Sequence, residues 1–180
     1  MEGRERLRLF VALLLPDEAV ARLVEWQERE LGGRPDLRIV PADNLHVTVA
    51  FLGGRPATDL EAIAADVLEA AREAAQPVLE PIRYQETRSV GMIALSDEEG
   101  RATKLAGRVF DGLERLGVYE RERRDWLPHV TVVRFRERPR LAPPSPDLGP
   151  VVSSELAVMI SRLRPSGAQY DVLESVPLGG

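Results

Sequence analysis

Apolar and polar positions divide the chain into short β-like runs and longer segments with helical spacing. Apolar, β-prone runs predict strands, and these cover residues 7–15, 37–40, 45–52, 78–84, 90–95, 130–135, 151–161 and 170–176. Apolar residues at helical spacing predict helices over residues 18–31, 58–75 and 100–116. Because strands and helices do not alternate regularly, the pattern predicts an α+β protein with largely antiparallel sheets.

The first predicted helix has clear end signals. Asp17 follows Pro16 and is the expected N-cap, and Gly32-Gly33 is the expected stop. The residues expected near its buried stripe are Ala19, Leu23, Trp26 and Glu30.

Residues 139–150 are rich in proline and predict a semi-rigid loop. Too little chain follows this loop to form a separate domain. We therefore expect residues 1–180 to form one domain.

Composition excludes several classes of site. Hydrophobic residues make up 44% of the chain and charged residues 29%, as in ordinary folded proteins. The absence of cysteine excludes disulfides, thiolate metal sites and cysteine nucleophiles. The net charge of −5 argues against a broad nucleic-acid-binding surface but leaves a local basic site open.

The N-terminal region shows no targeting signal. The longest apolar run, residues 9–15, is shorter than the ~20 residues that a membrane helix needs. Residues 1–6 carry mixed charge, and the apolar run ends at Pro16 without a small-residue cleavage site, so we expect no signal peptide. We expect a cytoplasmic monomer with no membrane partner.

Two tetrapeptides are identical: His46-Val47-Thr48-Val49 and His129-Val130-Thr131-Val132. They contain both histidines of the chain and begin 83 residues apart, close to half its length. This repeat predicts two pseudo-symmetric lobes of antiparallel sheet with outer helices. We expect the two motif strands to face each other across a central cleft.

Each copy falls in a predicted strand, where side chains alternate between the two faces. The histidine and threonine of a copy therefore share one face, and its two valines anchor the other face in the core. The resulting candidate pairs are His46 with Thr48 and His129 with Thr131.

Two imidazoles suit acid–base chemistry. Histidine has a pKa of about 6.5, so near neutral pH one ring can act as a base and the other as an acid. Threonine hydroxyls can donate to phosphate oxygens. The simplest interpretation is metal-independent displacement at phosphorus, in which one imidazole activates water and the other protonates the leaving oxygen.

Two simpler interpretations compete with this one. A single histidine on a strand is usually a core or surface residue, although two identical copies weaken that interpretation. A zinc site would need further ligands, and without cysteine or a third histidine these must be carboxylates. We therefore expect no metal ion and no cofactor.

At these residues the chain resembles the 2H phosphoesterase superfamily, and within it the bacterial and archaeal RNA 2′,3′-cyclic phosphodiesterases, historically called 2′-5′ RNA ligases. The first flank has Pro-Ala-Asp-Asn where the family often has Pro-Glu-Asn. The matching segments are Arg8–Ala12 with Pro16, Val40–Gly53, Trp126–Arg134, and Ser161-Arg162-Leu163 with Gly167 and Tyr170.

The resemblance implies two α+β lobes around a central cleft. It also implies hydrolysis of RNA 2′,3′-cyclic phosphate ends to 2′-phosphomonoesters, with 2′-5′ ligation as a reverse activity. By the family's assignment His46 is the proton donor and His129 the proton acceptor, and Thr48, Thr131 and Arg134 bind the substrate. The implied partners are RNA ends or short oligonucleotides with a 2′,3′-cyclic phosphate. The residues alone leave the two histidine roles exchangeable.

Arg134 conflicts with strand parity, because a regular strand places it on the face opposite Thr131. It reaches the cleft if the strand ends or bulges after Val132, or if its side chain bends round. The alternating arginines that follow predict either a basic stripe that guides RNA or a solvated strand end. This series is Arg134, Arg136, Arg138 and Arg140.

Two aromatic residues flank the motifs. For Phe51 and Trp126 core packing is favoured over base stacking.

Two other functions fit the histidine and threonine residues of the two motifs. One is a non-catalytic module that binds nucleotides or RNA ends, and the other is a cyclic phosphodiesterase for a small nucleotide such as ADP-ribose cyclic phosphate.

Overall fold

The computed structural model describes residues 5–179, so most of the mixed-charge N-terminus used to exclude a signal peptide lies outside the described residues. The strands are β1 (Arg6–Leu14), β2 (Arg38–Ile39), β3 (His46–Pro56), β4 (Val78–Glu86), β5 (Val90–Ser96), β6 (His129–Arg134), β7 (Val151–Val152), β8 (Glu155–Arg164) and β9 (Gly167–Pro177). The α-helices are α1 (Asp17–Leu31), α2 (Leu60–Ala71) and α3 (Arg101–Arg115).

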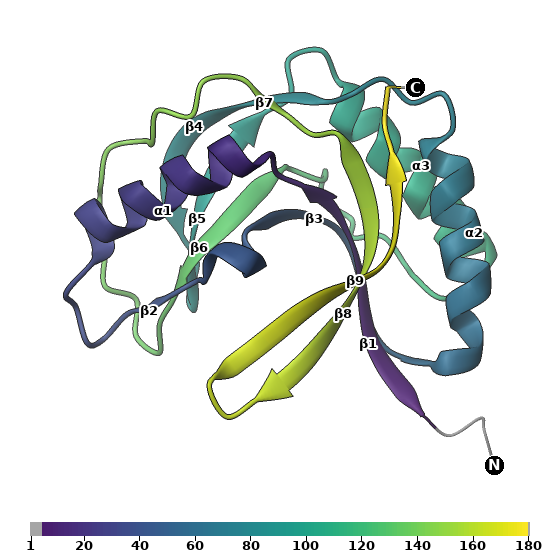
Figure 1. Ribbon diagram of the computed structural model, residues 1–180, viewed down its shortest axis with the longest axis horizontal. Coiled ribbons are helices and arrows are strands. Elements are labelled where there is room, and N and C mark those ends of the chain that lie inside the picture. The colour runs from purple at the N-terminus through teal and green to yellow at the C-terminus, as the bar shows by residue number, and fades with distance from the viewer. Residues whose placement is uncertain (1–4, 180) are drawn as a thin grey trace.

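The strands form one curled sheet (Figure 1). Their order is β7-β4-β5-β6-β3-β1-β8-β9, and β2 pairs with β6. The strand pairs in the ladder are antiparallel, from β1–β3 at the centre to β8–β9 at one edge. This arrangement confirms the predicted α+β class with an antiparallel sheet.

The two motif strands are neighbours in this sheet. β3 pairs with β6 at Val47 and Val130, and β3 then follows β1 while β6 follows β5. The expectation that the two motif strands face each other across a cleft is therefore wrong, because they pair side by side. One side of the sheet consists of β3, β1, β8 and β9, the other of β6, β5, β4 and β7, and the two sides join at the motif strands.

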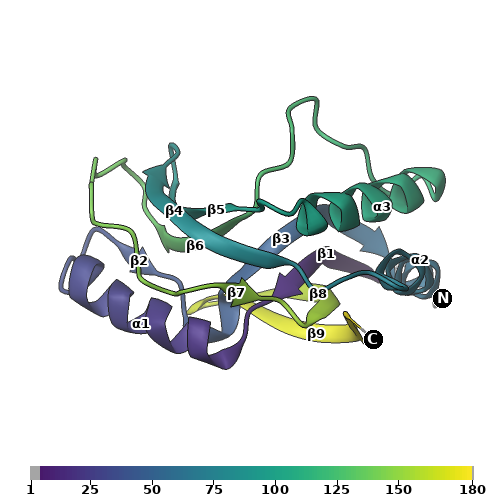
Figure 2. The same cartoon turned by 90° about the horizontal axis from the view of Figure 1, so that it is seen from above.

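The helices lie at the two ends of the sheet, with α1 at one end and α2 and α3 at the other (Figures 1 and 2). Helix α1 follows β1 in the chain but packs on β4 from the other side of the sheet, where the rings of Trp26 and Tyr84 are 6.1 Å apart. Helix α3, from the second half, contacts α2 and β3. Helices α1 and α3 thus each contact a strand on the side of the sheet opposite to the strand that they follow in the chain.

Helix α1 begins and packs differently from the prediction. Asp17 lies in the first turn, and Pro16 holds the N-cap position with no side-chain hydrogen bond. Glu30 is only partly buried, whereas Gln27 is buried. Leu23, Gln27 and Leu31, which are spaced four residues apart, are buried because this side of α1 faces β6.

Two other predicted boundaries are also wrong. The helix over 58–75 is α2, and a 3-10 turn at Ala57–Asp59 precedes it. The strand over 151–161 is divided, because β7 pairs with β4 whereas β8 pairs with β1 on the other side of the sheet.

No helix within residues 5–179 is both long and apolar enough to span a membrane.

The sheet has two differently packed faces. On β1, Leu9, Val11 and Leu13 point into the main core. Phe10 and Ala12 point to the opposite face, where they form a small second cluster with residues of β8. The motif residues lie on this second face.

Candidate active site

The histidines and threonines of the two motifs share one face of the sheet. The antiparallel register through Val47 and Val130 sets His46 opposite Thr131 and Thr48 opposite His129. The two histidines are therefore diagonal neighbours, about 7–8 Å apart between Cα atoms. All four side chains are partly exposed, whereas both valines are buried.

Both imidazoles are held through Nδ1 by a backbone carbonyl two residues earlier. His46 Nδ1 lies 2.8 Å from Asn44 O, and His129 Nδ1 lies 3.0 Å from Leu127 O. Because a carbonyl only accepts, each Nδ1 carries a proton and donates it, and Nε2 is the nitrogen left for chemistry. His46 Nε2 accepts from the Thr48 hydroxyl at 2.8 Å.

Burial sets the protonation state of the first histidine. It lowers the pKa of the His46 imidazole from 6.5 to about 4, against the effect of the hydrogen bond to Asn44 O. The positive charges of Arg134 and His129 lower this pKa further. His46 is consequently neutral at pH 7 in the free protein, which fits a ring whose Nε2 accepts from Thr48.

A β-bulge brings Arg134 to the same face. In β6 the register shifts between Thr131 and Val133, so Val132 is an extra residue. Val132 and Val133 are both buried, and Arg134 is exposed. A bulge at this point was one of the conditions that strand parity set for Arg134 to reach the site, and it is met.

Strand β3 has the same bulge at Val49. Phe51 follows His46 by five residues, as Arg134 follows His129, so the bulge brings Phe51 to the same face as the first motif. Phe51 is 53% exposed, so the prediction of core packing is wrong for this residue. The guanidinium carbon of Arg8 lies 5.7 Å from the centre of its ring. An exposed aromatic ring and an arginine thus occupy equivalent positions beside the four motif residues.

Gln27 stabilises the bulge in β6 and was not predicted. Its Nε2 donates to Val132 O at 2.8 Å and to Val40 O at 3.0 Å. The sequence holds a signal for this role, since Gln27 lies four residues from both Leu23 and Leu31 on the apolar stripe of α1. A buried amide needs partners, and the bulge carbonyl supplies one.

Trp126 links the two motifs. It packs against the main core, which confirms the prediction for this residue. Its indole Nε1 donates to Thr48 O at 3.2 Å. The segment before the second motif is therefore attached to the backbone of the first.

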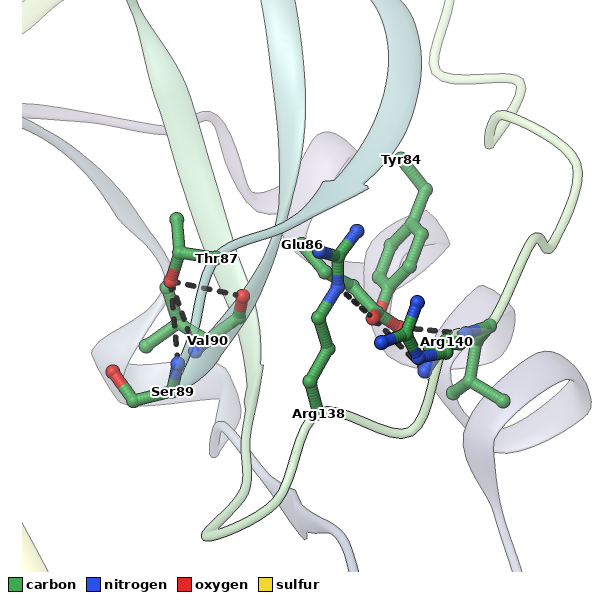
Figure 3. Close-up of polar contacts among 8 residues, drawn as sticks. Tyr84, Glu86, Thr87, Ser89, Val90, Arg138 and Arg140 are labelled. Carbon is green, nitrogen blue, oxygen red and sulfur yellow. Dashed lines mark hydrogen bonds and ion pairs between the residues drawn. The ribbon is translucent and has the colours of Figure 1, made fainter.

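The arginines after β6 do not form an extended stripe. The strand ends at Arg134, and the chain then bends towards Glu86, whose side chain is only 2% exposed (Figure 3). Burial would raise the pKa of Glu86, but its four donors together hold it below the usual value. These donors are Tyr84 Oη at 3.0 Å, Arg138 Nε at 3.1 Å, Arg140 N at 3.0 Å and Leu141 N at 2.8 Å.

Comparison with known proteins gives consistent relatives. The family described as LigT like Phosphoesterase matches residues 13–82. A Thermus thermophilus protein named RNA 2′,3′-cyclic phosphodiesterase is 31% identical over 97% of this chain and 91% of its own length. An Archaeoglobus fulgidus protein of the same name is 30% identical over 76% of this chain and 77% of its own.

A solved structure has the same fold. The crystal structure of TT0787 from Thermus thermophilus is 29% identical and superimposes with a TM-score of 0.83. The match covers 97% of this chain and 99% of TT0787. The curled sheet and its helices are thus shared over nearly all of the described chain.

Proposed function

Because the chain belongs to the LigT-like phosphoesterase family, we propose that it hydrolyses RNA 2′,3′-cyclic phosphate ends to 2′-phosphomonoesters without a metal ion. The names of its Thermus and Archaeoglobus relatives support this substrate class. The observation that carries the proposal is the shared face of the two His-x-Thr pairs, with both Nδ1 atoms bound to carbonyls. Two Nε2 atoms are thereby directed to one site.

The two histidines supply opposite proton transfers in the proposed reaction. His129 Nε2 removes a proton from a water molecule as the water oxygen bonds to phosphorus. The bond from phosphorus to the 3′-oxygen breaks, and His46 Nε2 protonates that oxygen. A 2′-phosphomonoester and a free 3′-hydroxyl result. A 5′-hydroxyl that attacked phosphorus in place of water would form a 2′-5′ linkage by the same two proton transfers.

Thr48, Thr131 and Arg134 are the proposed phosphate ligands. The hydroxyls donate to the non-bridging oxygens, and the guanidinium offsets the negative charge that develops on the transferring group. Arg134 is exposed at the end of β6, and its charge already acts on His46. It is therefore near enough to influence an anion at the same site.

The donor role of His46 requires a proton that the free protein lacks at pH 7, since burial lowers the pKa of this ring to about 4. We expect the bound phosphodiester to raise the pKa of His46, so that the ring gains this proton. Its negative charge offsets the effect of Arg134 and His129, and its leaving oxygen accepts a hydrogen bond from protonated Nε2, which in the free protein accepts from Thr48. Substrate binding should therefore be accompanied by proton uptake.

The proposed partners are RNA ends or short oligonucleotides, and the proposed working form is a cytoplasmic monomer. The exposed ring of Phe51 supports a nucleotide ligand, because an aromatic face can stack on a base. The mass of the enzyme in solution, with and without an oligonucleotide, tests the monomer.

The decisive experiment is product analysis on a substrate panel. The wild-type protein is incubated in excess EDTA with an RNA oligonucleotide, a mononucleotide and an ADP-ribose derivative, each carrying a cyclic phosphate. We expect the RNA end to be the best substrate and ³¹P NMR to show a 2′-phosphomonoester. Tight binding without product would favour the binding module, and a preference for the ADP-ribose derivative would favour the small-nucleotide enzyme.

A further inference from the structure

The β8–β9 hairpin, residues 155–177, packs directly on the first histidine. The ring of Tyr170 from β9 lies 5.4 Å from the His46 ring at 73°, an edge-on contact. Phe10 from β1 lies 5.0 Å from both rings. His46 is therefore enclosed by aromatic rings on two sides.

The hairpin also reaches the carbonyl that binds His46. The side chain of Asn44 donates from Nδ2 to Ala168 O at 2.8 Å. The backbone carbonyl of the same Asn44 accepts from His46 Nδ1 at 2.8 Å. One asparagine thus connects the hairpin backbone to the imidazole through two hydrogen bonds.

The second histidine has no such support among residues 5–179. His129 Nδ1 binds the carbonyl of Leu127, whose side chain is 70% exposed. No ring contact of the kind that His46 makes with Tyr170 involves His129 in the described chain. The hairpin is therefore specific to one of two otherwise identical motifs.

We propose that the β8–β9 hairpin is a positioning element for His46, with Tyr170 fixing the plane of the imidazole and Asn44 fixing the carbonyl that orients it. The role of this element in turnover rests on the function proposed above. Tyr170 and Asn44 are positioning residues, because they act through His46. The hairpin, together with Phe10, also covers the ring from water, and burial is the largest cause of its lowered pKa.

The charged and titratable groups around His46 come from two strands. Arg134 and His129 on β6 act on it electrostatically. On β9 the titratable group in contact is the Tyr170 phenol, and on β1 the contact is the uncharged Phe10. Removing the Tyr170 ring leaves Arg134 and His129 in place, so a change in His46 titration would report water access.

The test is NMR titration of the imidazoles, which is clear because the chain has only two histidines. A His129→Gln variant assigns the remaining signals to His46. In Tyr170→Ala we expect the His46 titration to move from about 4 towards the usual value of about 6.5. Tyr170→Phe keeps the ring and should titrate as the wild type does.

Two further variants separate positioning from folding. Asn44→Ala removes the bond to Ala168 but keeps the backbone carbonyl, and we expect a mixture of Nδ1–H and Nε2–H tautomers in ¹⁵N spectra. Gln169→Ala, on the exposed side of the same hairpin, is the matched control and should change neither signal. Circular dichroism and thermal melting show whether each variant is folded.

Activity gives the second readout. We expect Tyr170→Ala and Asn44→Ala to lower kcat about 10–100-fold with little change in KM, because misplacing an acid–base group affects the chemical step. Folded Tyr170→Ala and Asn44→Ala proteins with wild-type His46 titration and tautomer would overturn the proposal. If the wild type hydrolyses no cyclic phosphate, the proposed function fails, whereas the NMR result still decides the positioning role.

Discussion

The two motifs contain the same four residues and the same bulge, yet their neighbouring strands differ. Strands β1 and β8, beside the first motif, present apolar side chains to the site face. Strands β5 and β4, beside the second, present a mixture that includes charge. The first set is Leu14, Ala12, Ala157 and Met159, and the second is Ala94, Met92, Arg83 and Gln85.

This contrast shows how a repeated motif acquires two roles. The histidine of the apolar half is buried under aromatic rings, and its pKa falls to about 4. The histidine of the polar half borders an open loop, with exposed Leu127 before it. A proton donor and a proton acceptor must be in opposite protonation states, and different environments allow the fold to assign these states, so the asymmetry is part of the proposed mechanism.

The largest effect should come from removing either imidazole. His46→Ala and His129→Ala should each lower kcat by about 10²–10⁴-fold, the usual contribution of a general acid or base. Single-turnover assays on the cyclic-phosphate oligonucleotide measure this loss, and Arg22→Ala on the exposed side of α1 is the control. Full activity in both histidine variants would refute the two-histidine mechanism.

The next effect tests the position that differs between the motifs, Arg134 against Phe51. Arg134→Ala should lower kcat about 10²–10³-fold, because a charge that stabilises the transition state is lost. The same variant should raise the pKa of His46, since the arginine charge lowers it. Arg134→Lys should recover part of the rate, and Arg136→Ala should retain nearly all of it. Equal losses at both arginines would show a general charge effect.

The pH dependence of the free energy of unfolding should test the lowered pKa of His46, the histidine of the first motif. The unfolded chain protonates His46 near its usual pKa of 6.5, whereas the folded chain does so only near 4. The unfolded state therefore binds more protons between these values, and the free energy of unfolding falls as pH decreases, by about 3 kcal/mol from this group.

Urea unfolding of the wild type and His46→Gln between pH 7 and pH 4 measures this contribution. The variant should lose less stability on acidification than the wild type. Gln169→Ala should follow the wild-type curve. Parallel curves for His46→Gln and the wild type would show that His46 titrates alike in both states.

The smallest effect should be on substrate binding at Phe51. Phe51→Ala should raise KM about tenfold and leave kcat nearly unchanged, the value expected for one base stacked on an aromatic ring. Phe51→Tyr should behave as the wild type. A cyclic phosphate without a base, such as 1,2-cyclic glycerophosphate, should be insensitive to the change. An equal loss on both substrates would place Phe51 at the phosphate instead.

Much of the site was readable from local pattern. Alternation along a strand placed His46 with Thr48 and His129 with Thr131, and the α+β class followed from the order of the elements. Alternation also placed Arg134 on the face opposite Thr131 unless the strand bulged, and the structure has a bulge at Val132. These inferences succeed because side-chain direction in a strand depends on neighbours one or two residues away.

The remaining features depend on contacts between distant segments. Gln27 meets Val132 across 105 residues, and Asn44 meets Ala168 across 124. Local sequence patterns cannot predict contacts between residues this far apart in the chain. The exposure of Phe51 was predicted wrongly because the bulge at Val49, which alternation along the sequence does not show, turns this side chain to the site face.

The sequence by itself determined the chemistry: two copies of a histidine and a threonine, each pair on one face of a strand. Only the tertiary structure decided that the copies pair side by side, and that a hairpin near the end of the chain covers one histidine and leaves the other open. Burial and hydrogen bonding are properties of the assembled sheet. Two identical tetrapeptides therefore acquire different protonation behaviour from the segments packed around them.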